Sequence, residues 1–243
     1  MNKIVLVTGA SRGIGAATAL RLAKAGYSVC INYLSNKTLA EKSVAEINSN
    51  GGNAIALQAD VSNEKQVVHL FEKLDASLGN ITHLVNNAGI LLPQMPVVEM
   101  SAERINKILI TNVTSYFLCS REAIKRMDNG GSIVNVSSAA SRLGAPNEYV
   151  DYAASKGAID SLTTGLSLEL ASKNIRVNCV RPGFIDTDMH ADGGEPNRIE
   201  RVKGSIPLQR GGSPDEVAAS IAFLLSDDAS YITGTFVDVA GGR

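Results

Sequence analysis

The sequence predicts an α/β fold with a doubly wound parallel sheet, covered by helices on both faces. Short β-branched runs alternate with longer amphipathic stretches along all 243 residues. Most of these runs are apolar throughout, as in strands buried on both faces of a parallel sheet. The first run, Ile4–Val7, ends in a glycine-rich turn that leads into a small-residue helix, the opening of a βαβ unit. No linker or low-complexity segment interrupts the pattern, so we expect one domain over residues 1–243.

Strands and helices are expected in strict alternation. The expected strands are Ile4–Val7, Ser28–Tyr33, Ala54–Ala59, His83–Asn86, Ser132–Ser137, Arg176–Arg181 and Phe236–Val239. The expected helices are Ile14–Ala25, Thr38–Asn50, Glu64–Leu78, Ala102–Met127, Ala153–Ser172 and Pro214–Leu225. Ligands of such sheets bind beyond the carboxyl ends of the strands, so the residues just after each strand are the candidate site.

Composition argues against several classes of partner. The 23 Lys and Arg residues balance the 24 Asp and Glu residues to a formal net charge of −1, which favours neither nucleic acid nor a membrane surface. No apolar run reaches the length of a membrane span, and we expect no signal peptide. Cys30, Cys119 and Cys179 are widely spaced, which indicates buried thiols in a reducing compartment. The three histidines form no ligand spacing either. We expect a cytoplasmic protein without a metal site.

The turn after the first strand indicates a dinucleotide site. Glycines at 9, 13 and 15 would let backbone N–H groups approach a pyrophosphate, and the following helix adds the positive end of its dipole. The Gly-x3-Gly-x-Gly spacing differs from the strict dinucleotide fingerprint, so a plain strand-to-helix turn is the alternative.

The sequence favours NADP(H) over NAD(H). An NAD site normally places a carboxylate after the second strand to bind the ribose 2′-hydroxyl, but no Asp or Glu occurs between Gly26 and Glu41. Arg12 lies inside the glycine turn, where its guanidinium could bind a 2′-phosphate. The alternative is a solvated surface arginine.

Polar or small residues follow later elements as well. Asp60 comes after the third expected strand, where it could cap the next helix, accept a hydrogen bond from an adenine amino group, or do both. The segment Asn86-Asn-Ala-Gly89 follows the fourth strand and leaves room for a ligand against the backbone. Asn112 lies in an apolar helical stretch, where a buried amide must find partners. A satisfied core asparagine is the alternative there.

A serine, a tyrosine and a lysine suggest the chemistry. Ser138 follows the fifth expected strand, and Tyr152 and Lys156 are four residues apart, so they share one face if Tyr152 opens a helix. A phenol with an ordinary pKa of about 10 is a poor acid or base at neutral pH. A neighbouring ammonium lowers that pKa, as would the positive ring of an oxidised nicotinamide. The Ser138 hydroxyl could hold a substrate oxygen beside the phenol while hydride moves to or from the carbon.

In this order and spacing, the motifs resemble those of the short-chain dehydrogenase/reductase family. The resemblance runs from residue 3 to 242 and rests on Thr8-Gly-Ala-Ser-Arg-Gly-Ile-Gly15, Asp60-Val61, Asn86-Asn-Ala-Gly89, Asn112, Ser138, Tyr152-x3-Lys156, Pro182-Gly183 and Thr187. It implies a Rossmann fold with a seven-stranded parallel sheet, commonly in a homotetramer, so we expect a homo-oligomer.

The resemblance also implies a catalytic tetrad. In it, Tyr152 is the general acid/base and Ser138 positions the substrate oxygen. Lys156 lowers the tyrosine pKa and binds the ribose, and Asn112 holds a water in the proton relay. The cofactor contacts that it implies are Gly9, Ser11, Arg12, Gly13, Ile14, Gly15, Tyr33, Ser35, Asp60, Val61, Asn87, Ala88, Gly89, Tyr152, Lys156, Pro182, Gly183, Ile185 and Thr187.

Within the family, the Arg12 turn and the segment Val180–Met189 are similar to those of bacterial NADP-dependent reductases. These include 3-oxoacyl-(acyl carrier protein) reductases and sugar dehydrogenases of the glucose 1-dehydrogenase type. The resemblance implies hydride transfer between NADP(H) and a small-molecule carbonyl or secondary alcohol. The alternative from another class is a non-catalytic nucleotide-binding sensor, which the complete tetrad disfavours.

The loop before Tyr152 departs from the family pattern. Arg142–Asp151 is one residue longer than is usual between the serine and the tyrosine. It contains Tyr149, a competitor for the acid/base role. Tyr149 lacks a lysine four residues on, where Ala153 stands, so Tyr152 is preferred.

The segment Phe184–Ser205 is typical of a lid that closes on a substrate, because it combines glycines with charges. It has few apolar residues, which favours a polar or small carbonyl over a long acyl chain. Arg198, Arg201 and Lys203 could instead form the basic entrance that suits an acyl-carrier partner. Both interpretations stay open.

Overall fold

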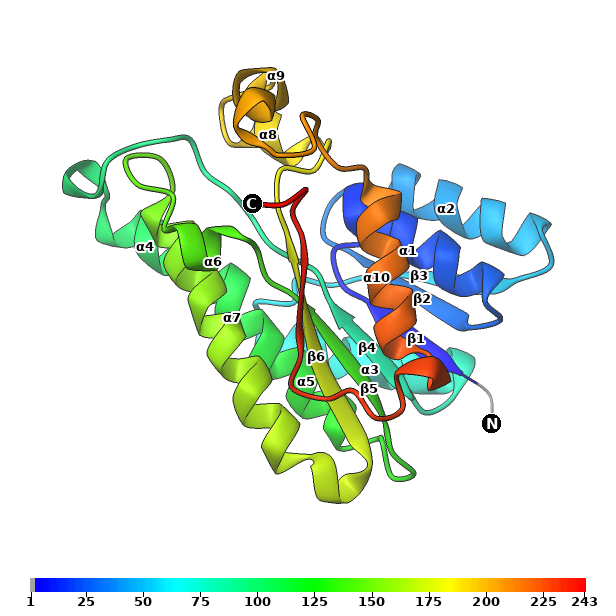
Figure 1. Cartoon of the computed structure of the whole chain (residues 1–243). Helices are drawn as coiled ribbons and strands as arrows, with labels where there is room; N and C mark the ends of the chain where they lie inside the picture. The colour runs from blue at the N-terminus through cyan, green and yellow to red at the C-terminus, as the bar shows by residue number, and fades with distance from the viewer. Residues whose placement is uncertain (1–2) are drawn as a thin grey trace.

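The structure is a computed structural model that describes residues 3–243. Seven strands form one parallel sheet in the order β3-β2-β1-β4-β5-β6-β7 (Figure 1). Their bounds are β1 Ile4–Val7, β2 Ser28–Tyr33, β3 Asn53–Gln58, β4 His83–Asn86, β5 Gly131–Val136, β6 Ile175–Pro182 and β7 Phe236–Val239. The strand order reverses between β1 and β4, so a crevice opens beyond the carboxyl ends of these two strands. The predicted doubly wound Rossmann fold is confirmed.

Helices cover both faces of the sheet (Figure 1). They are α1 Gly13–Lys24, α2 Lys37–Ser49, α3 Glu64–Leu78, α4 Ala102–Leu109, α5 Ser115–Ile124, α6 Ala140–Leu143, α7 Val150–Glu169, α8 Met189–Asp192, α9 Arg198–Val202 and α10 Pro214–Leu225. Successive strand residues point to opposite faces, so Val5 and Val7 join a core with α1, α2 and α10. Leu6 and Leu84 join a second core with α3 and α5. No helix in residues 3–243 is long and apolar enough to cross a membrane.

The helix expected over Ala102–Met127 is interrupted. A π-helical turn, Ile110–Thr114, separates α4 from α5, and α5 ends at Ile124. Such turns are rare and occur frequently at functional sites. This one contains Asn112, whose side chain is fully buried.

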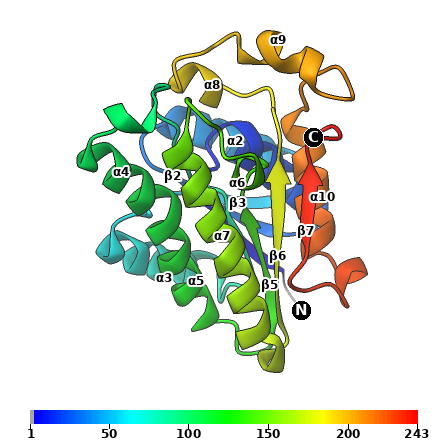
Figure 2. The ribbon, with the colours of Figure 1, turned by 60° about the vertical axis from the view of Figure 1, so that its left-hand side comes forward.

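The roof above the strands contains short helices that the sequence did not predict. Residues 184–205, the expected lid, carry α8 and α9 and lie beyond the carboxyl end of β6 (Figure 2). The long helix α7 begins at Val150, three residues before the expected start, so Tyr152 lies in its first turn.

Candidate active site

A cavity of about 450 Å³ lies at the carboxyl ends of the strands, below the roof. Its wall contains three of the four predicted catalytic residues and seven of the other predicted cofactor contacts: Ser138, Tyr152, Lys156, Ile14, Asn87, Gly89, Pro182, Gly183, Ile185 and Thr187. The other predicted residues lie outside this wall: Gly9, Ser11, Arg12, Gly13, Gly15, Tyr33, Ser35, Asp60, Val61, Ala88 and Asn112. The structure thus brings Ser138, Tyr152 and Lys156 together with residues that follow β4 and β6.

The glycine turn packs too tightly for side chains. A Cβ atom at Gly9, whose φ is +61°, would lie 2.9 Å from Ala88 Cα. A Cβ atom at Gly15 would lie 2.7 Å from both Ala10 Cα and Asn87 Nδ2. Only glycine lets this turn meet the loop after β4 so closely.

Two polar residues that sequence reasoning gave no role hold this turn. The Thr8 hydroxyl accepts hydrogen bonds from the backbone N–H groups of Asn87 (2.9 Å) and Ala88 (3.0 Å). Asn32 accepts a hydrogen bond from Gly9 N (3.2 Å) and donates to Ala59 O (3.1 Å). The available signal was a polar side chain at the end of an apolar strand, where it can tie neighbouring loops together.

The turn fits the phosphates of a dinucleotide. It presents bare backbone at the N-terminus of the twelve-residue helix α1, whose dipole favours an anion. On the opposite side, Thr187 faces it, since its Cγ2 would lie 3.4 Å from a Cβ atom at Gly13. A turn that exposes backbone N–H groups, with a threonine beside it, offers the hydrogen-bond donors that a pyrophosphate needs.

Arg12 is engaged with the roof. Its half-exposed guanidinium pairs with the carboxylates of Asp188 (3.4 Å) and Asp192. It therefore bridges the glycine turn and α8, and it is not an isolated solvated arginine. Two further predicted contacts lie at the end of β2 and just beyond it, where Tyr33 is buried in the core and Ser35 is exposed.

Asp60 caps no helix, which corrects one of its two expected roles. The N-cap of α3 is Asn63, whose side chain accepts a hydrogen bond from Gln66 N (3.1 Å). One Asp60 carboxylate oxygen instead accepts hydrogen bonds from the backbone N–H (2.9 Å) and the hydroxyl (2.6 Å) of Ser62. Five residues (59–63) separate β3 from α3, one more than the sequence indicated.

Ser138 and Tyr152 meet in the cavity wall. The Ser138 oxygen accepts a hydrogen bond from Ala140 N (3.1 Å), and its hydroxyl contacts Pro182 O only weakly (3.5 Å). The pKa of Tyr152 is raised by burial, and hydrogen bonding with Ser138 opposes that rise. This differs from the expected lowering, because burial of the phenol outweighs its neighbours.

The Lys156 ammonium lies near the ring of Tyr152 and donates its hydrogen bonds to other groups. Its Nζ lies 5.7 Å from the centroid of the Tyr152 ring and donates to Val136 O (2.8 Å) and to the Tyr116 hydroxyl oxygen (3.3 Å). Burial lowers the pKa of Lys156 to about 8. Sequence reasoning missed Tyr116, because a tyrosine in an amphipathic helix has the pattern of an ordinary core residue.

The buried amide of Asn112 makes three hydrogen bonds. Its oxygen accepts from Ile90 N (2.8 Å), and its nitrogen donates to Ile90 O (3.0 Å) and to Ser155 Oγ (3.2 Å). The Ser155 hydroxyl donates in turn to Tyr152 O (2.6 Å). The side chain thus ties the π-helical turn to the loop after β4 and, through Ser155, to the first turn of α7 at Tyr152.

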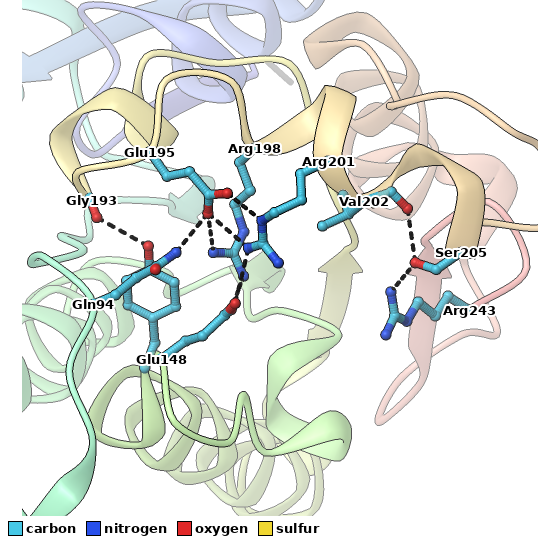
Figure 3. A network of polar contacts seen from close by, with 10 residues as sticks. Gln94, Glu148, Gly193, Glu195, Arg198, Arg201, Val202, Ser205 and Arg243 are labelled. Atoms are coloured by element: carbon cyan, nitrogen blue, oxygen red, sulfur yellow. Dashed lines mark hydrogen bonds and ion pairs between the residues drawn. The ribbon is translucent and has the colours of Figure 1, made fainter.

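A network of charged residues holds the roof over the cavity (Figure 3). Arg198 is 7% exposed and pairs with Glu148 and with Glu195 (3.0 Å). Arg201 pairs with the same two carboxylates, at 2.9 Å from Glu148. Arg201, with smaller effects of Gln94 and Arg198, lowers the pKa of Glu195 to about 2. The two cations of this network are therefore neutralised by its two anions.

The same region contains Tyr149 and the three cations of the possible basic entrance. The Tyr149 hydroxyl donates to Gly193 O in the roof (3.0 Å), so this tyrosine ties the loop before α7 to the expected lid. Lys203 pairs with Glu200 (2.5 Å). Each cation of the possible basic entrance therefore has a carboxylate partner within the roof and the adjoining loop.

The fold and the site define an oxidoreductase class, and the chain belongs to the short-chain dehydrogenase/reductase family. The family profile described as "Enoyl-(Acyl carrier protein) reductase" matches residues 9–243. "Uncharacterized oxidoreductase YgfF" of Escherichia coli (strain K12) is 62% identical over 99% of both chains. A 3-oxoacyl-(acyl-carrier-protein) reductase of Synechocystis is 42% identical over 99% of this chain and 96% of its own. A solved structure of a blue fluorescent protein from a metagenomic library, in complex with NADPH, is 36% identical with a TM-score of 0.92, covering 99% of this chain and 97% of that one.

Proposed function

We propose that this oxidoreductase is an NADP(H)-dependent carbonyl reductase, working reversibly as a secondary-alcohol dehydrogenase, with Tyr152 as its general acid/base. The observation that carries the proposal is the shared cavity of Ser138, Tyr152 and Lys156. The cavity lies beyond strand ends whose glycine turn fits a dinucleotide.

In the proposed reduction, the protein's own groups hold and protonate the carbonyl oxygen. The Ser138 hydroxyl donates a hydrogen bond to this oxygen, and Tyr152 gives it a proton as negative charge develops. Bound NADPH supplies the hydride to the carbonyl carbon. Lys156 orients the ribose and provides the positive charge that supports the transient phenolate. Asn112 holds a water that returns a proton to Tyr152.

A substrate panel tests this function. Purified protein is mixed with NADPH and with ketones, ketoesters and aldehydes, and loss of the reduced cofactor is followed by absorbance. We expect turnover of at least one ketone or ketoester. Cofactor binding without turnover on any member would favour the non-catalytic sensor.

The preference for NADP(H) is the second part of the proposal. No carboxylate follows β2, Arg12 lies at the glycine turn, and a relative of known structure was solved with NADPH. Arg12→Ala should weaken NADPH binding about tenfold or more and leave NADH binding nearly unchanged. Arg21→Ala, which removes another exposed arginine of α1, is the matched control. Equal losses for both cofactors would contradict a phosphate role.

The cavity supports a small, uncharged carbonyl compound as the substrate. Its wall contains Leu91, Leu143, Phe184 and Met189, and the charges of the roof are satisfied by one another. A 3-oxoacyl-(acyl carrier protein) reductase is the second candidate, favoured by the Synechocystis relative. A ketoester should therefore outperform its acyl-carrier thioester, and aldose sugars, which test the glucose 1-dehydrogenase alternative, should be poor. The reverse order would select one of the alternatives.

We also propose that the chain forms a homo-oligomer. Leu109 and Ile110 at the π-helical turn, Phe117 on α5 and Leu168 on α7 are exposed apolar side chains. Helices α4 and α7 pack side by side on this face (Figure 2), and exposed apolar patches mark interaction sites. Light scattering of the purified protein should give a mass of at least a dimer; a monomer would contradict the proposal.

A further inference from the structure

Tyr116 contacts Lys156 and is not part of the cavity wall. It is 1% exposed, in the first turn of α5 just after the π-helical turn. Its hydroxyl donates to Val136 O (2.9 Å), and its oxygen accepts from Lys156 Nζ (3.3 Å). Nζ also lies 5.2 Å from the centroid of the Tyr116 ring. The ammonium thus contacts both the oxygen and the ring of one buried tyrosine.

The direction of these hydrogen bonds determines which N–H of Lys156 is left for the cavity. Because the Tyr116 hydrogen is directed to Val136 O, the oxygen lone pair is left for the lysine. An ammonium has three N–H donors. Two are used by Val136 O and Tyr116, which leaves one for the cavity that Lys156 lines.

We propose that Tyr116 is a positioning residue for Lys156, which keeps the ammonium protonated and aims its remaining N–H into the cavity. The inference rests on the proposed function for its catalytic consequence. It assigns a role to a residue that touches neither the substrate nor the cofactor. Tyr116 acts instead on the lysine that does.

Of the other groups near Lys156, Cys179 and Asp160 raise its pKa, but by less than burial lowers it. Tyr152 from α7 and Cys179 from β6 are both neutral, because burial raises the pKa of each, to about 12 for the thiol. Asp160, one turn further along α7, is committed to Arg181 (2.9 Å). Asn112, from the π-helical turn, is an uncharged amide.

Burial disfavours the ammonium, since it lowers the pKa of Lys156 to about 8. The Tyr116 oxygen, its ring face and Val136 O contact the ammonium directly and add to these opposing effects. Loss of one of them should therefore change the charge of Lys156 within the working pH range.

Tyr116→Phe tests the inference, because it keeps the ring and removes the oxygen. We expect the pKa of Lys156 to fall by about half a unit to one unit. The pH at which kcat/KM for NADPH falls on the alkaline side should decrease by the same amount. Tyr116→Leu also removes the ring and should shift both further. Tyr27→Phe is the matched control, since it removes a buried hydroxyl that contacts only Leu225 O (3.4 Å), remote from the cavity.

The charge of Lys156 is read directly in the protein without substrate. Isotope-labelled lysine is followed by nuclear magnetic resonance against pH, and the Lys156 signal is assigned by its loss in Lys156→Met. The inference is supported if the Lys156 pKa from magnetic resonance and the alkaline pKa of kcat/KM fall together in the Tyr116 variants. Neither pKa should change in Tyr27→Phe. An unchanged lysine titration in the Tyr116 variants would overturn the inference. A lysine shift in a protein that reduces no carbonyl would leave the positioning role intact and remove the proposed function.

Discussion

The floor and the roof of the cavity are held by different interactions. At the floor, the buried side chains of Lys156 and Asn112 bond to neutral backbone groups of Val136 and Ile90. The roof is pinned by Arg198 and Arg201 on Glu148 and Glu195, in a network that reaches the surface (Figure 3). Salt screens exposed charges but not buried neutral hydrogen bonds. The chemistry is therefore built on a rigid base, whereas access to it depends on charges that solvent can weaken.

The largest effect belongs to the floor. Ser138→Ala removes the hydroxyl that holds the carbonyl oxygen, so kcat/KM should fall about a hundredfold with little change in NADPH affinity. The loss should be the same at low and high salt. Steady-state kinetics and cofactor titration measure both, and Ser138→Thr should restore part of the activity. If the loss of kcat/KM in Ser138→Ala depended on salt, the proposed difference between floor and roof would be wrong.

A roof variant should act on binding. Arg198→Met leaves Glu148 and Glu195 with only Arg201 between them, which should raise KM for the carbonyl about tenfold with kcat nearly unchanged. High salt should raise the wild-type KM by a smaller factor. Arg201→Met is the matched variant and should cost less, because Arg201 is half-exposed. A fall in kcat at constant KM would place Arg198 in the chemistry instead.

The two regions should also differ in their response to pH. Lys156 is protonated below its lowered pKa of about 8, so kcat/KM for NADPH should fall as pH rises through that value. Glu195, with its pKa lowered to about 2, stays ionised at any mildly acidic pH. KM for the carbonyl should therefore be flat between about pH 5 and 7. A rise in KM over that range would show that Glu195 titrates higher than its lowered pKa implies.

The smallest effect is expected outside both regions. Ser213 caps α10 in a reciprocal pair with Glu216, so Ser213→Ala should lower the free energy of unfolding by about 1 kcal/mol. Denaturant unfolding measures this loss. Kinetic constants should not move, which makes the variant a control for destabilisation as a cause of lost activity.

Much of the fold could be predicted because local patterns dictate it. Apolar runs such as Ile4–Val7 and the glycine turn after it define strands and crossovers without knowledge of distant partners. The residues that line the cavity were predictable for the same reason, since strand ends meet at one edge. The boundaries of Glu64–Leu78 and Pro214–Leu225 were also correct, because polar caps precede both helices.

What was missed depends on contacts between residues far apart in the chain. The π-helical turn forms around Asn112 and Ile90, 22 residues apart, and the roof joins Arg12 to Asp192, 180 residues apart. Hydrophobic periodicity in the sequence does not indicate which distant residues will pair. The Asp60 cap was wrong because a short turn precedes α3, and Tyr116 was overlooked because its partner lysine lies 40 residues away.

Tyr152→Phe tests the central claim most directly. Wild type and variant are compared with NADPH and the best ketone of the panel, with cofactor affinity measured in parallel. The account predicts that kcat falls at least a hundredfold while NADPH binds as before, because the variant keeps the ring and loses only the proton donor. Undiminished turnover by Tyr152→Phe would contradict it.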